Sequence, residues 1–419
     1  MRSPGKAGRE KKLLGRRLRQ KYLGKKGLIG LIAFLSAFVP LSTDLYLPAL
    51  PGMAMFFGVS TDLANLTLIL FFVFFAAGTL FWGPLSDKYG RRPVLLIGLS
   101  IYSLAGFLCA GSGDIYHLII FRILQAVGGS GAFAVATAMI KDVYEIENRE
   151  AILALVQSMV LISPMTAPVL GAFLLRFTSW RGIFLVLGGI GLLALAGSIA
   201  LQETIDKRYT GTMLQAWGRL GKVARNPGFT ILLIIFSMLS VSSMAFIAAS
   251  SYIYINSFGL SEQVYSYYFA LNALGMITGP MLYMRLSRRF LRRSIIMACF
   301  AAVSVSGLMI ALLGNIMPMV FALTLLPATV MASCVRTPGA NLMLEQQEED
   351  TGSASALMSC FGILMGSLGM TIISLSWSDP ILVLGEMNIL AGLTCLILWR
   401  MLANRPFIKQ IPETRVKAG

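Results

Sequence analysis

The sequence is divided into apolar runs of about twenty residues that follow one another from Gly27 to Leu402. A helix of this length can cross roughly 30 Å of hydrocarbon. Twelve runs can be counted, six on each side of a polar gap at residues 202–228. The first six are Gly27–Leu50, Ala64–Pro84, Pro93–Ser112, Ile115–Ile140, Ala151–Phe177 and Trp180–Leu201. The second six are Phe229–Tyr254, Tyr265–Leu286, Ser294–Gly314, Met317–Leu344, Ala354–Ser376 and Pro380–Leu402. The sequence therefore predicts an all-α polytopic membrane protein with two six-helix bundles.

Basic residues are distributed unevenly between the two faces that this topology creates. The chain has 35 Lys and Arg residues and a formal net charge of +16, and 31 of the 35 fall on one face. Only Arg176 and Arg181 fall on the other face, while Arg122 and Arg336 lie inside runs. Lys and Arg gather on the cytoplasmic side of membrane proteins, so we expect both termini to be cytoplasmic. The charge is explained by topology and does not indicate a nucleic-acid partner.

These observations predict five segments. They are a basic cytoplasmic tail at 1–26, an N-terminal six-helix bundle at 27–201, a cytoplasmic linker at 202–228, a C-terminal six-helix bundle at 229–402 and a cytoplasmic tail at 403–419. An even number of spans in each half makes the halves parallel, so we expect pseudo-symmetric bundles with a substrate path between them near the midplane. The linker stretch TMLQAWGRLGKVA is expected to form a short amphipathic helix at the inner surface.

The turn after the second run, GPLSDKYGRRP, resembles the loop between helices two and three of the major facilitator superfamily. That loop reads Gly, three residues, Asp, Arg or Lys, one residue, Gly, Arg, Arg or Lys. The matching positions are Gly83, Asp87, Lys88, Gly90, Arg91 and Arg92. We expect Gly83 to let neighbouring helices approach, Gly90 to form the tight turn and Asp87 to pair or cap. Asp87 and Arg91 are interpreted as gating residues; a positive-inside turn with accidental spacing is the alternative.

The turn after the eighth run, GPMLYMRLSRRFLRR, repeats the Gly-Pro pair and the basic residues, without a clear equivalent of Asp87. Two Gly-rich stretches, QAVGGSGAFAVATA and GILMGSLGM, place small residues three or four apart. We interpret these stretches as sites of close helix packing.

Four further stretches narrow the resemblance to the proton-driven multidrug exporters of the bicyclomycin and chloramphenicol resistance type. FRILQAVGGSG resembles the family's motif of Arg, two residues, Gln, Gly, with Arg122 and Gln125 present and Ala126 at the glycine position. SPMTAPVLGA resembles the antiporter motif. Pro168 and Gly171 match that motif, whereas Ala167 and Ala172 replace two of its glycines. LSTDLYLPALP and SWRGIF are also similar to these exporters.

The resemblance implies the major facilitator fold and the export of drugs or other amphiphilic small molecules by alternating access. It also implies proton coupling, location in the bacterial inner membrane and a monomeric state, with no cofactor and no metal. The expected partners are the substrate, protons and the lipid bilayer.

Asp44 is the one acidic residue of the first apolar run, where an isolated charge is costly. Asp44 lies seven residues before Pro51 and Arg122 lies seven residues after Ile115, so both are about 10 Å below the outer surface at 1.5 Å per residue. In the resembled fold their helices border the central cavity, which brings the two side chains within reach of each other. We interpret Asp44 and Arg122 as the proton-coupling pair, with Tyr46 and Gln125 in the substrate cavity.

The alternative role for Asp44 is to cap or hydrogen-bond the kinked outer end of the first helix, because Pro48 and Pro51 follow closely. Glu386 and Arg336 are weaker candidates for coupling, since Glu386 lies in a peripheral helix of the resembled fold and Arg336 can snorkel.

Two other functions compete with drug export. A membrane-embedded enzyme is disfavoured because His117 is the only histidine and neither metal-ligand spacing nor a supported catalytic triad occurs. A proton-linked carrier of a metabolite, such as a sugar or an amino acid derivative, would need a preorganised polar pocket. The second half offers few polar groups at mid-span, chiefly Asn272, Thr278 and Asn341.

Overall fold

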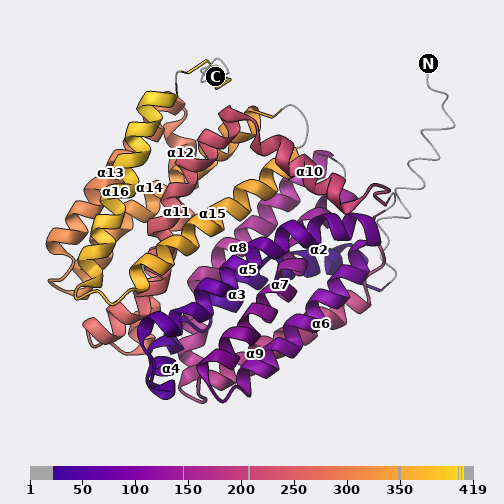
Figure 1. Cartoon of the computed structure of the whole chain (residues 1–419), viewed down its shortest axis with the longest axis horizontal. Helices are drawn as coiled ribbons and strands as arrows, with labels where there is room; N and C mark the ends of the chain where they lie inside the picture. The colour runs from indigo at the N-terminus through magenta and orange to yellow at the C-terminus, as the bar shows by residue number, and fades with distance from the viewer. Residues whose placement is uncertain are drawn as a thin grey trace.

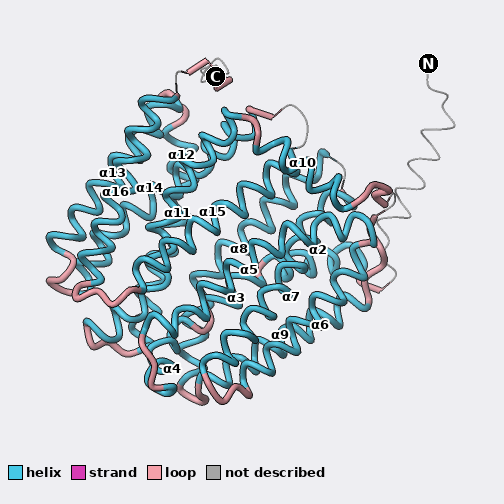
Figure 2. Tube along the Cα trace, in the orientation of Figure 1, coloured by secondary structure: helices cyan, strands magenta, loops and turns pink. Residues whose placement is uncertain are grey.

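The computed structural model describes residues 22–144, 146–205, 208–347, 351–403, 405–406 and 408–409. Within these residues the chain forms helices joined by short turns and contains no strand (Figures 1 and 2). The all-α architecture expected from the apolar runs is confirmed. Most of the two predicted tails, residues 1–21 and 410–419, lies outside the described part.

The long helices run side by side between two ends of the molecule (Figure 1). We call the end that carries α4 the α4 end, and the end that carries α10 the α10 end. The helices before the linker are α2 (Gly24–Ser36), α3 (Phe38–Asp44), the 3-10 helix η1 (Leu47–Ala49), α4 (Leu50–Phe57), α5 (Thr61–Tyr89), α6 (Arg91–Ala110), α7 (Ile115–Val143), α8 (Ile146–Leu175) and α9 (Trp180–Ile199).

After the linker helix α10 (Met213–Ala224), the second half repeats this order. Its helices are α11 (Pro227–Ser251), the π-helix η2 (Tyr252–Ser257), α12 (Glu262–Leu286), α13 (Arg292–Leu313), α14 (Pro318–Glu345), α15 (Thr351–Ser374) and α16 (Pro380–Leu402).

The two halves have the same packing pattern. In the first half α7 packs on α5 and α6, and α6 packs on α9; in the second half α14 packs on α12 and α13, and α13 packs on α16. Two further pairs join the halves, α5 with α15 and α8 with α12. α5 of the first half corresponds to α12 of the second, and α8 corresponds to α15. Exchanging the halves therefore turns one pair into the other, so the contact between the halves is pseudo-symmetric.

Each of the twelve predicted runs contains a helix. By length and composition, nine helices of the described part can cross a membrane, and a bent pair in the first run makes a tenth. Within the described residues of α8, the apolar helical stretch is Ile162–Leu175, which is shorter than the helices counted as spans. α12 is less apolar because it carries Tyr265, Tyr267, Tyr268 and Asn272. Membrane passage of α8 and α12 therefore stays a prediction.

The first run is broken, not continuous. Its segments Lys26–Ser36 and Pro40–Phe57 are bent by 45° at residues 37–39. A second interruption follows at Leu45 and Tyr46, between α3 and η1. Pro48 and Pro51 lie in the first turns of η1 and α4. Proline has no backbone N–H to donate, so a helix breaks or restarts where it occurs. The chain between Asp44 and Leu47 is therefore irregular, and Asp44 ends α3.

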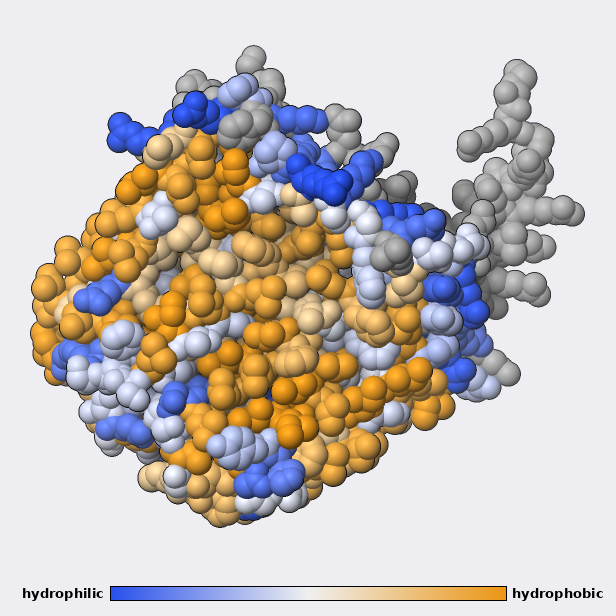
Figure 3. Space-filling model, in the orientation of Figure 1, coloured by the Kyte–Doolittle hydropathy of each residue, from blue (hydrophilic) through white to orange (hydrophobic). Residues whose placement is uncertain are grey.

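A broad band of apolar side chains covers the face of the molecule seen in Figure 3, and hydrophilic residues gather at its two ends. Large exposed apolar residues include Leu104, Leu193, Leu312, Leu390 and Ile397. An apolar surface of this extent is not tolerated in water and matches contact with lipid.

The apolar interior differs between the two ends. At the α4 end one cluster combines residues of both halves, such as Tyr46 and Leu50 with Tyr254 and Phe321. At the α10 end each half has its own cluster, one built between Leu28 and Leu201 and the other between Val223 and Ile408. The halves are therefore joined most extensively at the α4 end.

The linker contacts both halves. The Trp217 indole N–H of α10 donates a 3.4 Å hydrogen bond to the Leu80 carbonyl oxygen, and its ring lies beside Phe81. α10 also packs on α15. At the end of the linker, the Asn226 side-chain amide donates to the Gln346 carbonyl oxygen at 2.8 Å. The linker thus bridges the two halves.

Candidate functional site

Asp44 is a buried carboxyl group at the helix break, with 6% of its surface exposed. Its Oδ1 atom accepts a 3.0 Å hydrogen bond from the Thr43 hydroxyl. The segment that follows, η1, packs on α11 and α12 of the other half. Asp44 therefore lies directly before a segment through which the first half contacts the second.

Arg122 of α7 is completely buried and held by oxygen atoms of three segments. Its Nη1 donates to the Gln125 Oε1 at 2.6 Å and to the Ser42 carbonyl oxygen at 3.2 Å. Its Nε donates to the Thr67 carbonyl oxygen at 3.4 Å. The Ser42 carbonyl is free to accept because the helical bonding of α3 ends two residues later. The helix break thus provides one of the acceptors of Arg122.

Aromatic rings surround the Arg122 guanidinium. Its Cζ lies 4.1 Å from the ring centre of Phe71, 4.6 Å from that of Tyr46 and 5.6 Å from that of Phe184. Each distance is within the range of a cation–π interaction. The Tyr46 hydroxyl is 3.3 Å from that of Thr67. Tyr46 and Gln125, predicted cavity residues, are fully buried in this conformation.

The contact expected between Asp44 and Arg122 is not formed. In the described part of the chain neither an ion pair nor a hydrogen bond joins them. Equal depth does not determine the partners: the Asp44 carboxyl group accepts from Thr43, and Arg122 donates to the Ser42 carbonyl oxygen. Among the described residues, two buried donors of the Arg122 site, its Nη2 and the Gln125 Nε2, have no hydrogen-bond partner.

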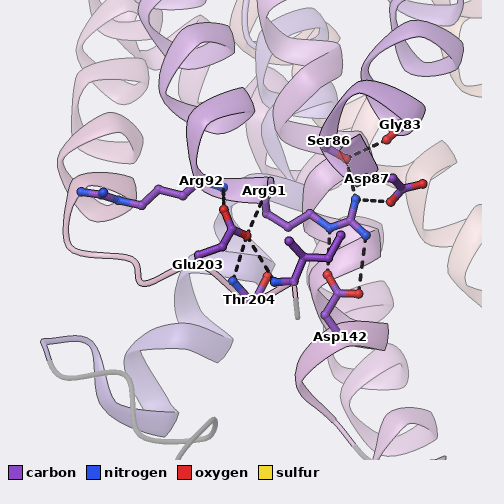
Figure 4. Close-up of polar contacts among 9 residues, drawn as sticks. Gly83, Ser86, Asp87, Arg91, Arg92, Asp142, Glu203 and Thr204 are labelled. Atoms are coloured by element: carbon purple, nitrogen blue, oxygen red, sulfur yellow. Dashed lines mark hydrogen bonds and ion pairs between the residues drawn. The ribbon is translucent and has the colours of Figure 1, made fainter. Parts of the chain in front are cut away.

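Arg91 is the centre of the predicted gating motif, in the turn between α5 and α6 (Figure 4). Its guanidinium forms ion pairs with Asp87 at 2.5 Å and with Asp142, the latter through Nε at 2.8 Å. Nη1 also donates to the Ser86 hydroxyl at 2.6 Å. Since only 5% of Arg91 is exposed, these acceptors compensate the burial of its charge. Ser86 and Asp142 were not anticipated, although Asp142 ends a run on the same face.

Glu203 of the linker also binds this turn. Its Oε1 accepts from the Arg91 backbone N–H at 2.9 Å, and its Oε2 accepts from that of Arg92 at 3.2 Å. A carboxylate at a helix N-terminus satisfies backbone donors that have no partner within the helix. Gly90 has a φ of 111°, and a Cβ there would overlap the Glu203 carboxylate. Gly90 is therefore required by both conformation and space.

The remaining residues of the motif have simpler surroundings. Lys88 lies over the Tyr89 ring at 5.7 Å, and the Arg92 guanidinium donates to the Ile199 carbonyl oxygen at 2.9 Å. The close helix approach expected at Gly83 is wrong, because a Cβ there would meet no atom within 4 Å. The Gly83 carbonyl oxygen instead accepts a 2.8 Å bond from Ser86.

The antiporter-motif residues Pro168 and Gly171 are buried in α8. A Cβ on Gly171 would overlap the carbonyl oxygen of Leu45, the residue after Asp44. In the second half Gly369 of α15 approaches the Val241 carbonyl oxygen of α11 in the same way. The absence of a side chain at Gly171 therefore allows α8 to pack directly on the helix break.

The Gly-rich stretches are packing sites, as expected. A Cβ on Gly128 would lie 2.6 Å from the Gly98 carbonyl oxygen, so α7 and α6 touch through their backbones. The weaker candidates Arg336 and Glu386 are exposed on α14 and α16. Among the described residues, His, Cys, Asp and Glu form no group of three or more that could hold a metal ion.

A family model described as Major Facilitator Superfamily matches residues 32–370, which is well over half of the chain. This chain belongs to the major facilitator superfamily. The resemblance found in the turn after the second run is thus confirmed. Members of this superfamily transport small molecules.

Several bacterial relatives match most of this chain. The uncharacterised MFS-type transporter YdgK of Bacillus subtilis is 29% identical over 358 residues, covering 83% of this chain and 88% of YdgK. The bicyclomycin resistance protein homolog of Haemophilus influenzae is 25% identical, covering 80% and 87%. The chloramphenicol resistance protein of Pseudomonas aeruginosa is 28% identical, covering 85% and 87%. The relatives are transporters, so the chain is a transporter and not an enzyme.

Two solved structures share the fold of this chain. The nucleoside transporter NupG superposes with a TM-score of 0.67 at 10% identity, covering 89% of this chain and 100% of NupG. A D-xylose-proton symporter superposes with a TM-score of 0.63 at 16% identity, covering 92% and 97%. At these identities the likeness shows the fold alone.

Proposed function

We propose that this transporter exports drugs or other amphiphilic small molecules in exchange for protons, by alternating access. The observation that carries the proposal is the buried Asp44 at the end of α3, directly before the η1 segment that packs on the other half, with no described cation beside it. Relatives named for bicyclomycin and chloramphenicol resistance support the substrate class.

Asp44 is the proposed proton carrier. A buried carboxyl group without a nearby cation is more stable protonated than ionised. Asp44 would take up a proton when the α4 end opens, carry it in the conformation described here, and release it towards the α10 end as substrate enters. A proton moving inward down a potential of about 100 mV releases about 2.3 kcal/mol, which drives the cycle.

Arg122 is proposed to respond to that release. Its guanidinium is held in the interior by the Ser42 carbonyl oxygen and by Gln125. Once Asp44 is ionised, its attraction to Arg122 would favour a rearrangement of the α3–η1 segment, because opposite charges attract strongly in a medium of low dielectric constant. Proton binding and movement of the break would thereby be coupled.

The orientation in the membrane is part of the proposal. In the described part of the chain, the turns and segments on the α10 side carry most of the Lys and Arg residues. The positive-inside rule then puts this side and both termini in the cytoplasm of a bacterial cell, with the transporter in the inner membrane. The joined α4 end would face outwards, so the described conformation would be the one that accepts substrate from the cytoplasm. A monomer suffices for this cycle.

A second candidate is the export of a small anionic metabolite. It is favoured by the two buried donors without partners, Nη2 of Arg122 and Nε2 of Gln125. Buried polar groups normally have partners, so a carboxylate of a substrate could occupy this position when the halves rearrange. Stimulation of proton uptake by carboxylates, and not by neutral drugs, would favour this candidate.

The test is proton uptake by proteoliposomes of defined orientation when substrate is added. We expect Asp44→Asn to abolish substrate-linked proton movement while binding of a neutral substrate persists, because an amide cannot release a proton. The matched control is Asp62→Asn, which changes an exposed carboxylate at the start of α5. Normal coupling in Asp44→Asn would refute the coupling role and leave the helix-capping role.

A further inference from the structure

The turn between α12 and α13 has an excess of positive charge. It carries five arginines within nine residues, Arg285, Arg288, Arg289, Arg292 and Arg293. One ion pair is formed within the described residues, between the Nη1 of Arg292 and the Oε1 of Glu345 at 2.9 Å. The guanidinium groups of Arg285, Arg288 and Arg289 have no hydrogen bond or ion pair in that part of the chain.

The equivalent turn of the first half is neutralised internally. Between α5 and α6, Asp87 and Asp142 bind the Arg91 side chain. Glu203 accepts the backbone N–H groups at the start of α6. Among the described residues, the pseudo-symmetric turn of the second half thus has more arginines and fewer carboxylates. An anion from outside the chain is the simplest way to balance this difference.

These three arginines line a pocket of about 380 Å³ together with Leu286 and Phe290. The rim is apolar, since Phe290 is 58% exposed and the neighbouring Met284 is 59% exposed. A site of this composition combines donors for an anionic headgroup with contacts for hydrocarbon. A soluble anion would use the donors and leave the apolar rim uncovered.

We infer that this pocket binds the phosphate-bearing headgroup of an anionic phospholipid. Guanidinium groups bind phosphate oxygens through paired hydrogen bonds. Basic pockets at the ends of transmembrane helices attract anionic headgroups, and each Lys or Arg contributes about 1 kcal/mol, or roughly a fivefold factor in affinity. The bound phosphate would balance the charge of the α12–α13 turn, as Asp87 and Asp142 do for the other turn.

The experiment measures lipid binding to the purified full-length chain by native mass spectrometry, with phosphatidylglycerol and phosphatidylcholine as probes. We expect phosphatidylglycerol to bind more tightly. Replacing Arg285, Arg288 and Arg289 by Gln should weaken phosphatidylglycerol binding about fivefold for each arginine removed. Replacing all three by Lys should restore part of the affinity, and unfolding in phosphatidylcholine alone checks that each variant is folded.

A matched variant tests whether the effect is local. Arg219→Gln, Lys222→Gln and Arg225→Gln remove the same charge from the exposed face of α10. Equal weakening by both triple variants would overturn the proposal, because net charge alone would then explain binding. Equal competition by glycerol phosphate, which has no acyl chains, would also overturn it, since the occupant would be a free phosphate.

The chain's own acidic residues Glu348, Glu349 and Asp350 lie outside the described part and are the internal alternative. Their amide variant should leave the preference for phosphatidylglycerol unchanged. A preference that emerged only in that variant would refute lipid as the native occupant. The outcome does not depend on transport, so this proposal and the proposed export function can fail separately.

Discussion

The side-chain amide of Asn65 donates a 2.8 Å hydrogen bond to the hydroxyl of Ser374, which joins α5 to α15 across the two halves. Both side chains are buried at the α4 end. The Ser374 hydroxyl in turn donates to the Met370 carbonyl oxygen at 2.6 Å. These two hydrogen bonds connect a side chain of the first half to the helical backbone of the second half.

Loss of the hydrogen bond between Asn65 and Ser374 should favour opening of the α4 end. We expect Asn65→Ala to shift the conformational equilibrium about fivefold, since a hydrogen bond contributes roughly 1 kcal/mol. The measurement is the distance distribution between spin labels at the exposed positions 62 and 376. Asn315→Ala is the control, because it removes the 2.6 Å bond to Asp379 within one half. Similar shifts in both variants would mean that the Asn65 bond has no special role.

Arg91→Ala should reduce turnover more than Asp87→Asn does. Arg91 is bound to both Asp87 and Asp142, so its removal leaves two carboxylates without their cation, whereas Asp87 is half exposed. Removing one partner of a buried pair costs about 3–5 kcal/mol, and a half-exposed partner contributes less. Transport rates and direct substrate binding should be measured for both variants. Turnover should fall while binding survives; parallel loss of both would indicate misfolding.

The two motif glycines Gly83 and Gly171 should respond oppositely to alanine. A Cβ at Gly171 overlaps the Leu45 carbonyl oxygen, so Gly171→Ala should cost about 1–3 kcal/mol and impair transport. A Cβ at Gly83 meets no atom, and alanine favours helix by about 1 kcal/mol, so Gly83→Ala should keep or raise stability. Thermal unfolding in detergent and drug transport check this pair. A harmless Gly171→Ala would contradict the close approach of α8.

The proposed topology can be tested with reporter enzymes that are active only outside the cytoplasm. A reporter fused after Gly419 should be inactive, and one inserted at Thr178, between α8 and α9, should be active. The reason is the concentration of basic residues on the α10 side. Activity of the Gly419 fusion would reverse the proposed orientation if the Thr178 insertion were inactive, and would require a different count of spans if the Thr178 insertion were active.

The helices could be predicted from the sequence because lipid imposes a simple length and an apolar composition. The break of the first run could be predicted only in part. Pro48 and Pro51 indicate a kink, but the exact end of α3 at Asp44 depends on packing against Gly171 and α12. Those contacts are tertiary and leave no local pattern.

The functional residues were predictable where a motif repeats a fixed spacing. Arg91 and Gly90 belong to one turn, so their relationship is local. Glu203 lies 112 positions from Arg91, and nothing in its neighbourhood indicates that it caps α6. Equal depth suggested that Asp44 and Arg122 would touch, but depth does not determine the direction in which a side chain points.

The linker helix α10 has a mechanical consequence. It is bonded to α5 through Trp217 and packs on α15, while its flanking residues hold the Arg91 turn and Gln346. The two halves are therefore tethered at the α10 end by a short connection, and the length of that connection limits how far they can separate. A small molecule bound beneath α10 would restrict the relative movement of the two halves, and would thereby inhibit transport without competing with substrate.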